Sequence, residues 1–453
     1  MKNDMKADVL MKKHSEIKEI FKLSWPVMLA MIFQSMLGTV DTYFISKLGT
    51  SQSAAASLSN SASGIIFVIS TLVSAGTIAL VARSFGEGNM DDVRRFSGQS
   101  IMLSALIGGM LSFVCYLNTE SIIKILFNPG PQELLYAKEY LLIIFPATIL
   151  VFLNSALRTI FQAYGDTKTP LYIFGISNII NAFFCFLFMN VLHFGIRGSA
   201  FAAVIAMGYS FITINVILIN RIYSSNIKNF IRSLKLFEKD SIRILKIGGW
   251  ACLQQLARPI TGALMFGIVY QVGGKEGAAA FGIGGQLFNY TFIFLVGLST
   301  AIAIMVGHSL GRGDINGCDK IIKEGMKLAF INILLFSIFY VIFPAQLMRI
   351  FINNPIVVKN GVEYLRIVFA GIIFVAPTTI YGGVFQGAGD TFPPMIASIV
   401  ANVLLKLPLA YILAKVFSFG TIGVWISISL SVLMESLIIF IYYRRDKWKE
   451  KKI

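Results

Sequence analysis

The chain has 453 residues, 56% of them hydrophobic and only 14% charged, and its mean hydropathy is +0.74. This composition is too apolar for a water-soluble globular domain and indicates a multi-pass membrane protein in contact with the lipid bilayer. The net charge of +16 would also suit a nucleic-acid-binding protein, but the basic residues alternate with apolar segments and no DNA- or RNA-binding motif accompanies them, so we expect no nucleic-acid partner.

Apolar stretches of about 20 residues, long enough to cross about 30 Å of hydrocarbon, recur along the whole sequence. We predict twelve spans, at residues 23–46, 55–82, 97–117, 138–163, 170–192, 198–220, 246–271, 279–307, 325–346, 363–386, 393–417 and 421–443. They are continuous apolar runs separated by short turns, without the alternating pattern of a membrane β-barrel. The sequence therefore predicts an all-α integral membrane protein.

Lysine and arginine collect in alternate loops. If both termini are cytoplasmic, about 27 of the 39 Lys and Arg residues lie on the cytoplasmic side and about 9 outside. No small-residue cleavage site follows the basic segment at residues 12–22 and the first apolar run, so we expect a retained cytoplasmic segment rather than a signal peptide. The pattern predicts a multi-pass protein of the cell membrane (inner or plasma membrane) with cytoplasmic N- and C-termini.

Two ten-residue segments are nearly identical: FQAYGDTKTP at 161–170 and FQGAGDTFPP at 385–394, an offset of 224 residues (385 minus 161). Nearly the same offset relates five further pairs: Trp25 and Trp250, SFGEGNMDD (84–92) and SLGRGDING (309–317), Tyr140 and Tyr364, Asn178 and Asn402, and GIRG (195–198) and GTIG (420–423). Matches in the same order indicate a duplicated six-helix unit. An even number of helices keeps the two halves in one orientation, so we predict two lobes related by a pseudo-two-fold axis along the membrane normal.

This duplication sets the predicted domains: a first lobe at 1–220 with the cytoplasmic N-terminal segment, a cytoplasmic linker at 221–245, and a second lobe at 246–453 with the basic tail. The repeated segment itself is expected to build a helical hairpin. In each copy a glycine would end one helix, an Asp-Thr pair would satisfy free backbone N–H groups, and a proline would suit the next first turn. The positions are Gly165, Asp166, Thr167 and Pro170, and Gly389, Asp390, Thr391 and Pro394.

Four stretches together resemble the multidrug and toxic compound extrusion (MATE) family of the MOP flippase superfamily. They are WPVMLAMIFQSMLGTVDTYFISKLG (25–49), the paired glycine turns, FQAYGDTKTP with its second copy, and SNIIN followed by GIRGSA. The resemblance extends from about residue 17 to 443. It implies two six-helix lobes around a cavity that opens alternately to either side, and ion-coupled export of amphipathic, often cationic, organic compounds in exchange for H⁺ or Na⁺.

Only two carboxylates fall well inside predicted spans, Asp41 and Glu435. A charge buried in a span costs at least ~2.5 kcal/mol, so each is a functional candidate. Asp41, in TVDTYF, matches the first-helix aspartate of the family motif. Because a low dielectric favours a neutral carboxyl group, Asp41 could take up a proton and release it when the lobe opens to water. The alternative is a helix-end carboxylate wetted at the outer surface.

Two asparagines could complete an ion site at Asp41. Asn178 and Asn181 lie three residues apart on the fifth span, hence on one face, and amide oxygens can coordinate Na⁺. Asn181 resembles the asparagine near the first-helix aspartate in the family. One branch carries a second carboxylate four residues further on, where this chain has Cys185, which weakens a two-carboxylate proton relay.

Three more residues of the first lobe are candidates for cargo binding. Gln34 lies two turns below Asp41 on the same helix face, although packing between helices would explain it equally well. Pro26 and Tyr140 match positions that the family uses to bend its first helix and line this lobe. Pro26 could instead mark the first turn of that helix.

The second lobe departs from the family pattern. Arg258 lies near the position where one branch carries a glutamate, so that branch's ion site is not transferred here. Arg258, Lys406 and Glu435 are expected to pair, which would reduce the cost of burying them. One interpretation is that the cluster contacts cargo or takes part in the movement of the lobes during transport. The other is that it only holds the seventh, eleventh and twelfth predicted spans together, or that the Lys406 side chain extends toward the membrane interface.

The leading prediction is a multidrug antiporter that works as a monomer on small amphipathic compounds without a cofactor. A flippase for lipid-linked saccharides in the same superfamily is the alternative, because two intramembrane cations would suit anionic cargo. The turn ARSFGEGNMDD lacks the basic pattern expected of a major-facilitator transporter.

We expect no enzymatic activity, since the sequence has no nucleotide-binding motif and no paired acid and base, and the three histidines are scattered. The cysteines show no metal-site or disulfide spacing, so neither is expected; they are Cys115, Cys185, Cys252 and Cys318.

Overall fold

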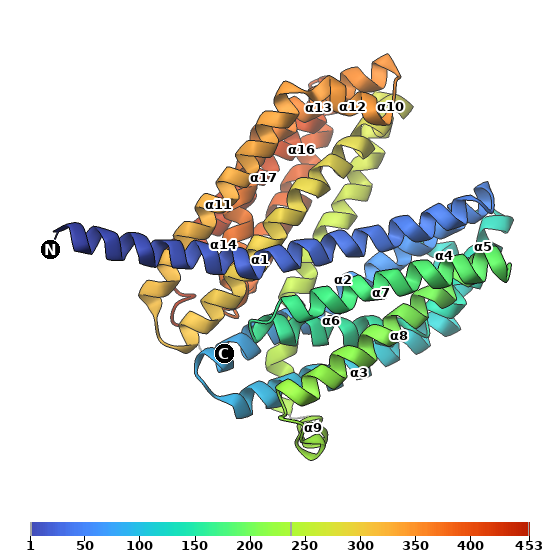
Figure 1. The fold of residues 1–453 in the computed structure, drawn as a ribbon. Helices are drawn as coiled ribbons and strands as arrows, with labels where there is room; N and C mark the ends of the chain where they lie inside the picture. Colours follow the sequence, from blue (N-terminus) through green and yellow to red (C-terminus); the bar gives the residue numbers. More distant parts are fainter. Residues whose placement is uncertain (1, 236–237, 452) are drawn as a thin grey trace. The chain divides into compact units, whose positions relative to one another are not determined.

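The computed structural model describes residues 2–235, 238–451 and 453, and this part of the chain is helical with short connections and no strand (Figure 1). Ten of the described helices are long and apolar enough to cross a membrane, and α5 with α6 forms an eleventh span bent by 52°. The helix α10 contains two spans, because Gly274 inside it has a positive φ of 61°. The twelve-span, all-α prediction is therefore confirmed for the described residues.

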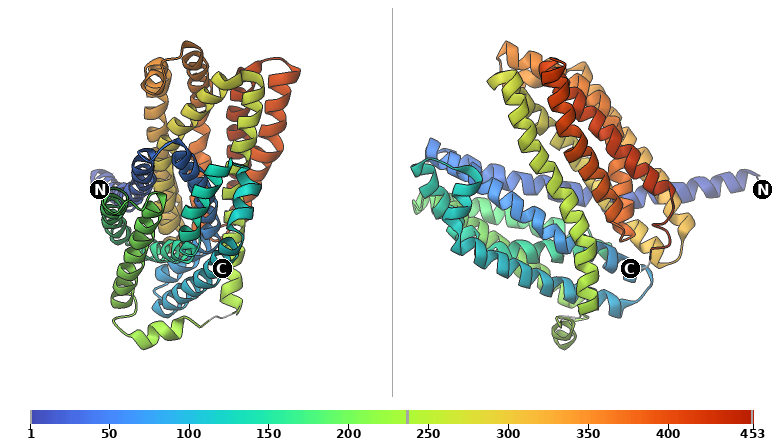
Figure 2. Two further views of the ribbon diagram at one scale, coloured as in Figure 1. Left: turned by 90° about the vertical axis from the view of Figure 1, so that its right-hand side faces the viewer. Right: turned by 180° about the vertical axis from the view of Figure 1, so that it is seen from behind.

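The first half contains nine α-helices, with bounds α1 (Lys2–Ser46), α2 (Thr50–Gly86), α3 (Met90–Leu117), α4 (Thr119–Phe127), α5 (Pro131–Ile144), α6 (Thr148–Ala163), α7 (Lys168–Phe186), α8 (Ile196–Arg221) and α9 (Ile227–Ser233). The π-helical turn η1 (Leu187–Val191) extends α7. Within this half, α2, α3, α6 and α8 form one bundle, in which α6 packs against each of the other three (Figures 1 and 2).

The second half begins with α10 (Glu238–Gly311). It continues through α11 (Ile315–Ile342), α12 (Pro344–Phe351), α13 (Pro355–Gly371), η2 (Ile372–Phe374), α14 (Val375–Gly387), α15 (Phe392–Ser398), η3 (Ile399–Lys406), α16 (Leu407–Tyr411), η4 (Ile412–Val416) and α17 (Gly420–Arg444). The segments α15 to η4 form one span. Pro408 lies in it, and because a proline ring clashes with the carbonyl of the preceding turn, the wide π-helical turn η3 just before it relieves that clash.

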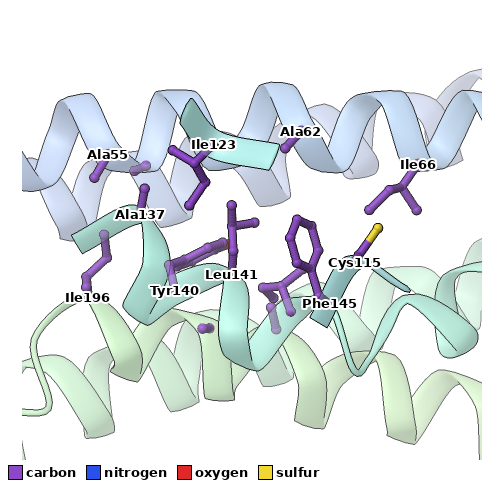
Figure 3. Close-up of a cluster of buried hydrophobic side chains, with 14 of the residues drawn as sticks. Ala55, Ala62, Ile66, Cys115, Ile123, Ala137, Tyr140, Leu141, Phe145 and Ile196 are labelled. Atoms are coloured by element: carbon purple, nitrogen blue, oxygen red, sulfur yellow. The ribbon is translucent and has the colours of Figure 1, made fainter. Parts of the chain in front are cut away.

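The chain divides into two compact units. One is Trp25–Cys252, and the other comprises the described residues of Met1–Ser24 and Leu253–Ile453. The first unit has an apolar core between α2, α5 and α8, where Tyr140 and Leu141 of α5, and Phe145 just after it, lie near small residues of α2 such as Ala55 and Ala62 (Figure 3). Small residues let helices in a membrane protein approach closely, which explains the Ala- and Ser-rich sequence of α2.

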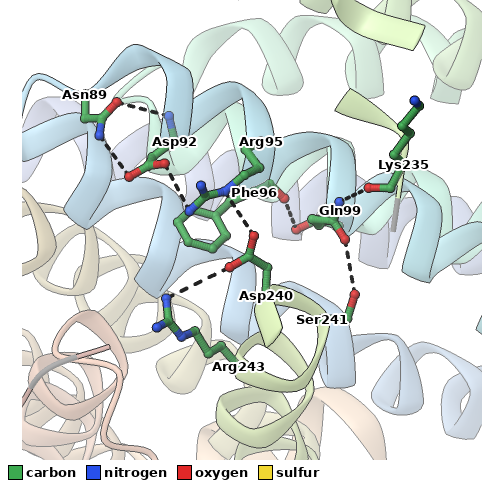
Figure 4. A network of polar contacts seen from close by, with 10 residues as sticks. Asn89, Asp92, Arg95, Phe96, Gln99, Lys235, Asp240, Ser241 and Arg243 are labelled. Carbon is green, nitrogen blue, oxygen red and sulfur yellow. Dashed lines mark hydrogen bonds and ion pairs between the residues drawn. The ribbon is translucent and has the colours of Figure 1, made fainter. Parts of the chain in front are cut away.

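The segment between the two halves is tightly packed rather than loose. Arg95 of α3 binds Asp240 (Nε to Oδ2, 3.0 Å), and Ser241 donates a hydrogen bond to Gln99 (3.1 Å) (Figure 4). Gly248 faces the backbone carbonyl of Leu72, where any Cβ would clash. These contacts hold the start of α10 to the first unit. Residues 236–237 of the predicted linker lie outside the described residues.

The two repeated turns have the same backbone. Gly165 and Gly389 have φ values of 92° and 73°, and the N–H groups of Asp166 and Asp390 each donate to a carbonyl five residues earlier, both at 2.9 Å. This is a helix C-cap in which glycine supplies the left-handed residue.

The next helix begins from the same turns. The Asp166 carboxylate accepts hydrogen bonds from the N–H groups of Lys168 (3.2 Å) and Thr169 (3.0 Å), whereas the Thr167 side chain makes no capping bond. Pro170 and Pro394 each occupy the third position of the helix that follows, in its first turn. The first repeated segment thus ends one helix and caps the next.

Candidate functional site

Asp41 is buried inside the first unit, with 4% of its surface exposed. It lies on α1, which continues to Ser46, and its neighbours come from α7 and α8. The Cys185 thiol donates a hydrogen bond to Asp41 Oδ1 (3.2 Å). With its amide oriented to satisfy both neighbours, Asn181 donates to the same oxygen (3.3 Å) and accepts from the backbone N–H of Ala203 (3.3 Å). Asp41 is therefore held by neutral donors and is not a solvent-wetted carboxylate.

The geometry of α7 and α8 explains this convergence. Asn181 and Cys185 are four residues apart, hence one above the other on one helix face. The helix α8 starts after Gly195, whose positive φ of 60° turns the chain. Ser199, near the start of α8, lies beside Asp41, Cys185 and Tyr140.

Sequence reasoning identified part of this site. The structure buries Asp41, Asn181 and Tyr140 in the same unit, and it adds the contacts of Cys185 and Ser199 with Asp41, which the sequence analysis did not predict. Cys185 had been noted only as a departure from a carboxylate. A signal for Ser199 existed, because it lies in the GIRGSA stretch.

Three predicted residues lie elsewhere. Asn178 donates its amide to the backbone carbonyl of Phe174 in its own helix (2.8 Å) and makes no recorded bond to Asp41. Gln34 is exposed, and Pro26 is buried in the interior of α1. Since α1 begins at Lys2, the interpretation of Pro26 as a first-turn residue is wrong.

The charged residues of the second half form a chain. Lys406 Nζ donates to Asn402 Oδ1 (2.7 Å), Asn402 Nδ2 donates to Glu435 Oε2 (3.1 Å), and Arg258 Nη2 lies 3.6 Å from Glu435 Oε1. Glu435 is 4% exposed, and the Arg258 guanidinium lies over the Phe292 ring, 4.9 Å from its centroid. The structure thus brings the three predicted charges together, and Asn402, which was known only as a repeat partner, joins them.

No group of three or more His, Cys, Asp or Glu side chains suited to a metal ion occurs within the described residues. A carboxylate with amide and hydroxyl neighbours at Asp41 can hold a proton or a monovalent cation. The Arg258–Glu435–Asn402–Lys406 chain carries two cations and one anion, so it could hold an anionic group.

Twelve apolar spans in two six-helix halves, each with charged residues inside the spans, define an integral membrane transporter. The family model described as MatE matches residues 26–187 and again residues 251–412, one match in each half. The chain therefore belongs to the MatE family of transporters, as its motifs predicted, and the paired matches confirm the duplication.

Two relatives and one solved structure illustrate the similarity. The probable multidrug resistance protein NorM of Thermotoga maritima is 25% identical over 440 residues, covering 96% of this chain and 94% of the relative. Multidrug and toxin extrusion protein 1 of Xenopus tropicalis is 25% identical over 448 residues, covering 96% and 75%. A solved outward-facing multidrug resistance MATE transporter of the MOP superfamily has a TM-score of 0.88 at 21% identity, covering 96% and 97%. This structural likeness confirms the two-lobe, twelve-helix fold.

Proposed function

We propose that this protein is a secondary active antiporter that exports amphipathic, often cationic, organic compounds in exchange for H⁺ or Na⁺. The observation that carries the proposal is the environment of Asp41. Its contacts among the described residues are the neutral groups of Cys185, Asn181 and Ser199. An ionised carboxylate in a membrane span without a basic partner is costly, so a cation from solution would relieve that cost. The names of the relatives support multidrug export.

The neighbours of Asp41 favour a proton as the coupling ion. Hard cations take oxygen ligands, whereas the hydrogen bond to Asp41 Oδ1 at 3.2 Å comes from the sulfur of Cys185, a softer atom. A proton needs only the carboxylate itself. Protonation would remove the charge and shift the balance between two conformations of the first lobe, and this shift would couple ion uptake to cargo release.

The remaining predictions fit this proposal. We infer a monomer in the cell membrane with both termini cytoplasmic, without enzymatic activity, cofactor or nucleic-acid partner. The lobes would comprise residues 1–220 and 246–453, joined by 221–245. Gln34, Pro26 and Tyr140 would contact cargo or shape its path, and Asn178 would support the ion site through its helix.

Dye efflux from proteoliposomes with the purified protein tests the proposal. A pH gradient and a Na⁺ gradient are imposed separately, and the release of a cationic dye is followed. Efflux driven by the pH gradient alone is expected. Efflux driven by Na⁺ alone would make Asp41 part of an oxygen cage, and a response to neither gradient would contradict the antiporter.

A lipid-linked saccharide flippase is a second candidate. It is favoured by the excess positive charge of the second-half cluster, where Glu435 is the one anion found near Arg258 and Lys406 in the described part of the chain. Such cargo carries phosphates, which bind arginine and lysine. Gradient-independent movement of a phosphorylated polyprenyl saccharide between bilayer leaflets would support this candidate over the antiporter.

A further inference from the structure

The second-half cluster lies deep in the membrane. Lys406 is near the middle of the span Phe392–Val416, and Glu435 is near the middle of Gly420–Arg444. Arg258 is in the interior of the first span of α10, before the break at Gly274. Charges at this depth cannot all reach the interface, so the charges of the cluster have to be balanced locally.

The balance within the cluster is incomplete. Among the described residues, the charged groups close enough to act on Lys406 are Glu435, which attracts it, and Arg258, which repels it. The cluster therefore has two cations and one anion. Lys406 donates a hydrogen bond to the neutral amide of Asn402. An ammonium group has three N–H donors, so it can donate to further acceptors. Arg258 stays 3.6 Å from Glu435, beyond hydrogen-bond range.

Two lysine ion pairs of the same unit are more direct than the contacts in the cluster. Elsewhere in the same unit, Lys327 binds Glu324 directly at 2.7 Å, and Lys449 binds Asp319 at 3.1 Å. In the cluster an amide separates Lys406 from Glu435, and the arginine remains partly exposed. Both cations thus keep donors for a further acceptor, and one added monoanion would bring the formal charge to zero.

We propose that Arg258 and Lys406 bind a carboxylate group of the transported compound, with Asn402 positioning Lys406 and Glu435 offsetting part of the positive charge. A guanidinium matches the two oxygens of a planar carboxylate, and the ammonium group adds a point charge. Phe292, which lies against the guanidinium, offers an apolar surface for the carbon frame of the compound. The preferred cargo is then a zwitterionic amphiphile, with a carboxylate as well as a cationic group. This inference rests on the proposed export function and narrows its substrate class.

A matched pair of dyes tests the inference. Rhodamine 110 carries a free carboxylate, and rhodamine 123 is its methyl ester, so the two differ in that group alone. The purified protein is placed in phosphatidylcholine nanodiscs, which contain no anionic lipid, and binding is measured by fluorescence anisotropy. Lys406→Met and Arg258→Gln should each weaken rhodamine 110 binding about 10-fold, and rhodamine 123 binding less than about 2-fold.

Three further variants make the test specific. Lys406→Arg keeps the charge and should retain rhodamine 110 binding. Lys415→Met removes a lysine of the same span that is bound to Gln271 outside the cluster, and should change neither dye. Glu435→Gln removes the competing anion and should strengthen rhodamine 110 binding, so the inference remains testable even if Lys406→Met does not fold.

The outcomes separate the two proposals. Carboxylate recognition would be overturned if the variants weakened the binding of both dyes equally or weakened the binding of neither. It would also be overturned if the wild-type protein bound rhodamine 123 but not rhodamine 110. Each of these results would leave the proposed export function standing. If the wild-type protein bound neither dye, the multidrug proposal would fail together with the inference.

Discussion

The fifth and eleventh spans are equivalent in the duplication, yet they carry opposite chemistry. Asn178 and Asn402 are 224 residues apart, and each donates its amide to the carbonyl four residues earlier, Phe174 at 2.8 Å and Ser398 at 3.0 Å. Four residues further along, the first half has Ala182 and the second half has Lys406. The repeat has kept the local backbone contact while the charges around it have changed.

The two copies of the duplicated fold therefore differ in the charge of their buried polar sites. Among the described residues, the contacts of the buried Asp41 in the first half are with neutral groups, and the second-half cluster has two cations and one anion. Under the two proposals above, a cation from solution would balance the first site and an anionic group of the cargo would balance the second. Substitutions that remove one charge at a time test whether the two sites differ in function and in stability.

The largest effect is expected at Asp41. Asp41→Asn keeps the size of the side chain and removes its charge. The free-energy cost of a buried carboxylate, which binding of the coupling ion would offset, is then absent. Gradient-driven dye efflux from proteoliposomes should fall at least about 10-fold, while dye binding in nanodiscs changes little. Glu133→Gln, which changes a half-buried acid in the first turn of α5, away from Asp41 in sequence, serves as the control. Efflux equal to wild type in Asp41→Asn would remove the coupling role.

The two equivalent asparagines should differ in stability. Asn402→Ala leaves Glu435 Oε2 and Lys406 without their amide bridge in a buried place, which should cost about 1–3 kcal/mol. Asn178→Ala removes a bond within one helix on a half-buried side chain, and a change within about 0.5 kcal/mol is expected. Thermal unfolding of both variants in one detergent measures the contrast. Equal shifts in Tm would mean that the two sites have not diverged energetically.

Sequence reasoning reached the fold because apolar length and the repeat are local signals. The twelve spans and the repeated glycine turns follow from these signals without tertiary information. It also identified Asp41, Arg258, Lys406 and Glu435, because a charge inside an apolar run is conspicuous.

Neutral partners were harder to find. Cys185, Ser199 and Asn402 are ordinary residues in a membrane helix, and only the packing of α7 on α8 or of η3 on α17 shows that they face a charge. Asn178 shows that spacing along a helix does not fix which group a side chain contacts. It lies three residues from Asn181, yet its amide turns back to its own helix.

The two halves also differ in the segment that follows each final helix. After α8, Tyr223 is buried, its hydroxyl donates to the carbonyl of Arg94 (2.9 Å) and accepts from Ser233 (2.9 Å), and burial raises the pKa of Tyr223 to about 12. Tyr223→Phe should destabilise the protein by about 1 kcal/mol, because both hydrogen bonds are lost from a buried place. The shift in Tm measures it. Tyr116→Phe, an exposed tyrosine on α3, should leave Tm unchanged.

The segment after α17 is held by ion pairs of Lys449 instead. We expect the smallest effect on stability from a substitution there. Burial alone would lower the pKa of Lys449, but hydrogen bonds and charge from Asp319 and Asp446 outweigh it and raise the pKa above its ordinary value of 10.5. The ion pair therefore contributes fully below pH 10.5, and its contribution is lost as the pH rises through the folded pKa.

Lys449→Met should cost about 0.5 kcal/mol at pH 7, because both carboxylates are well exposed and solvent screens the pair. The Tm difference from wild type should vanish above the folded pKa and shrink in high salt. A loss as large as that of Tyr223→Phe, or one insensitive to salt, would mean that packing of the lysine stem rather than charge holds the tail. The segments after α8 and α17 would then both be held by non-ionic contacts, and the difference in charge between the halves would be confined to the residues inside the spans.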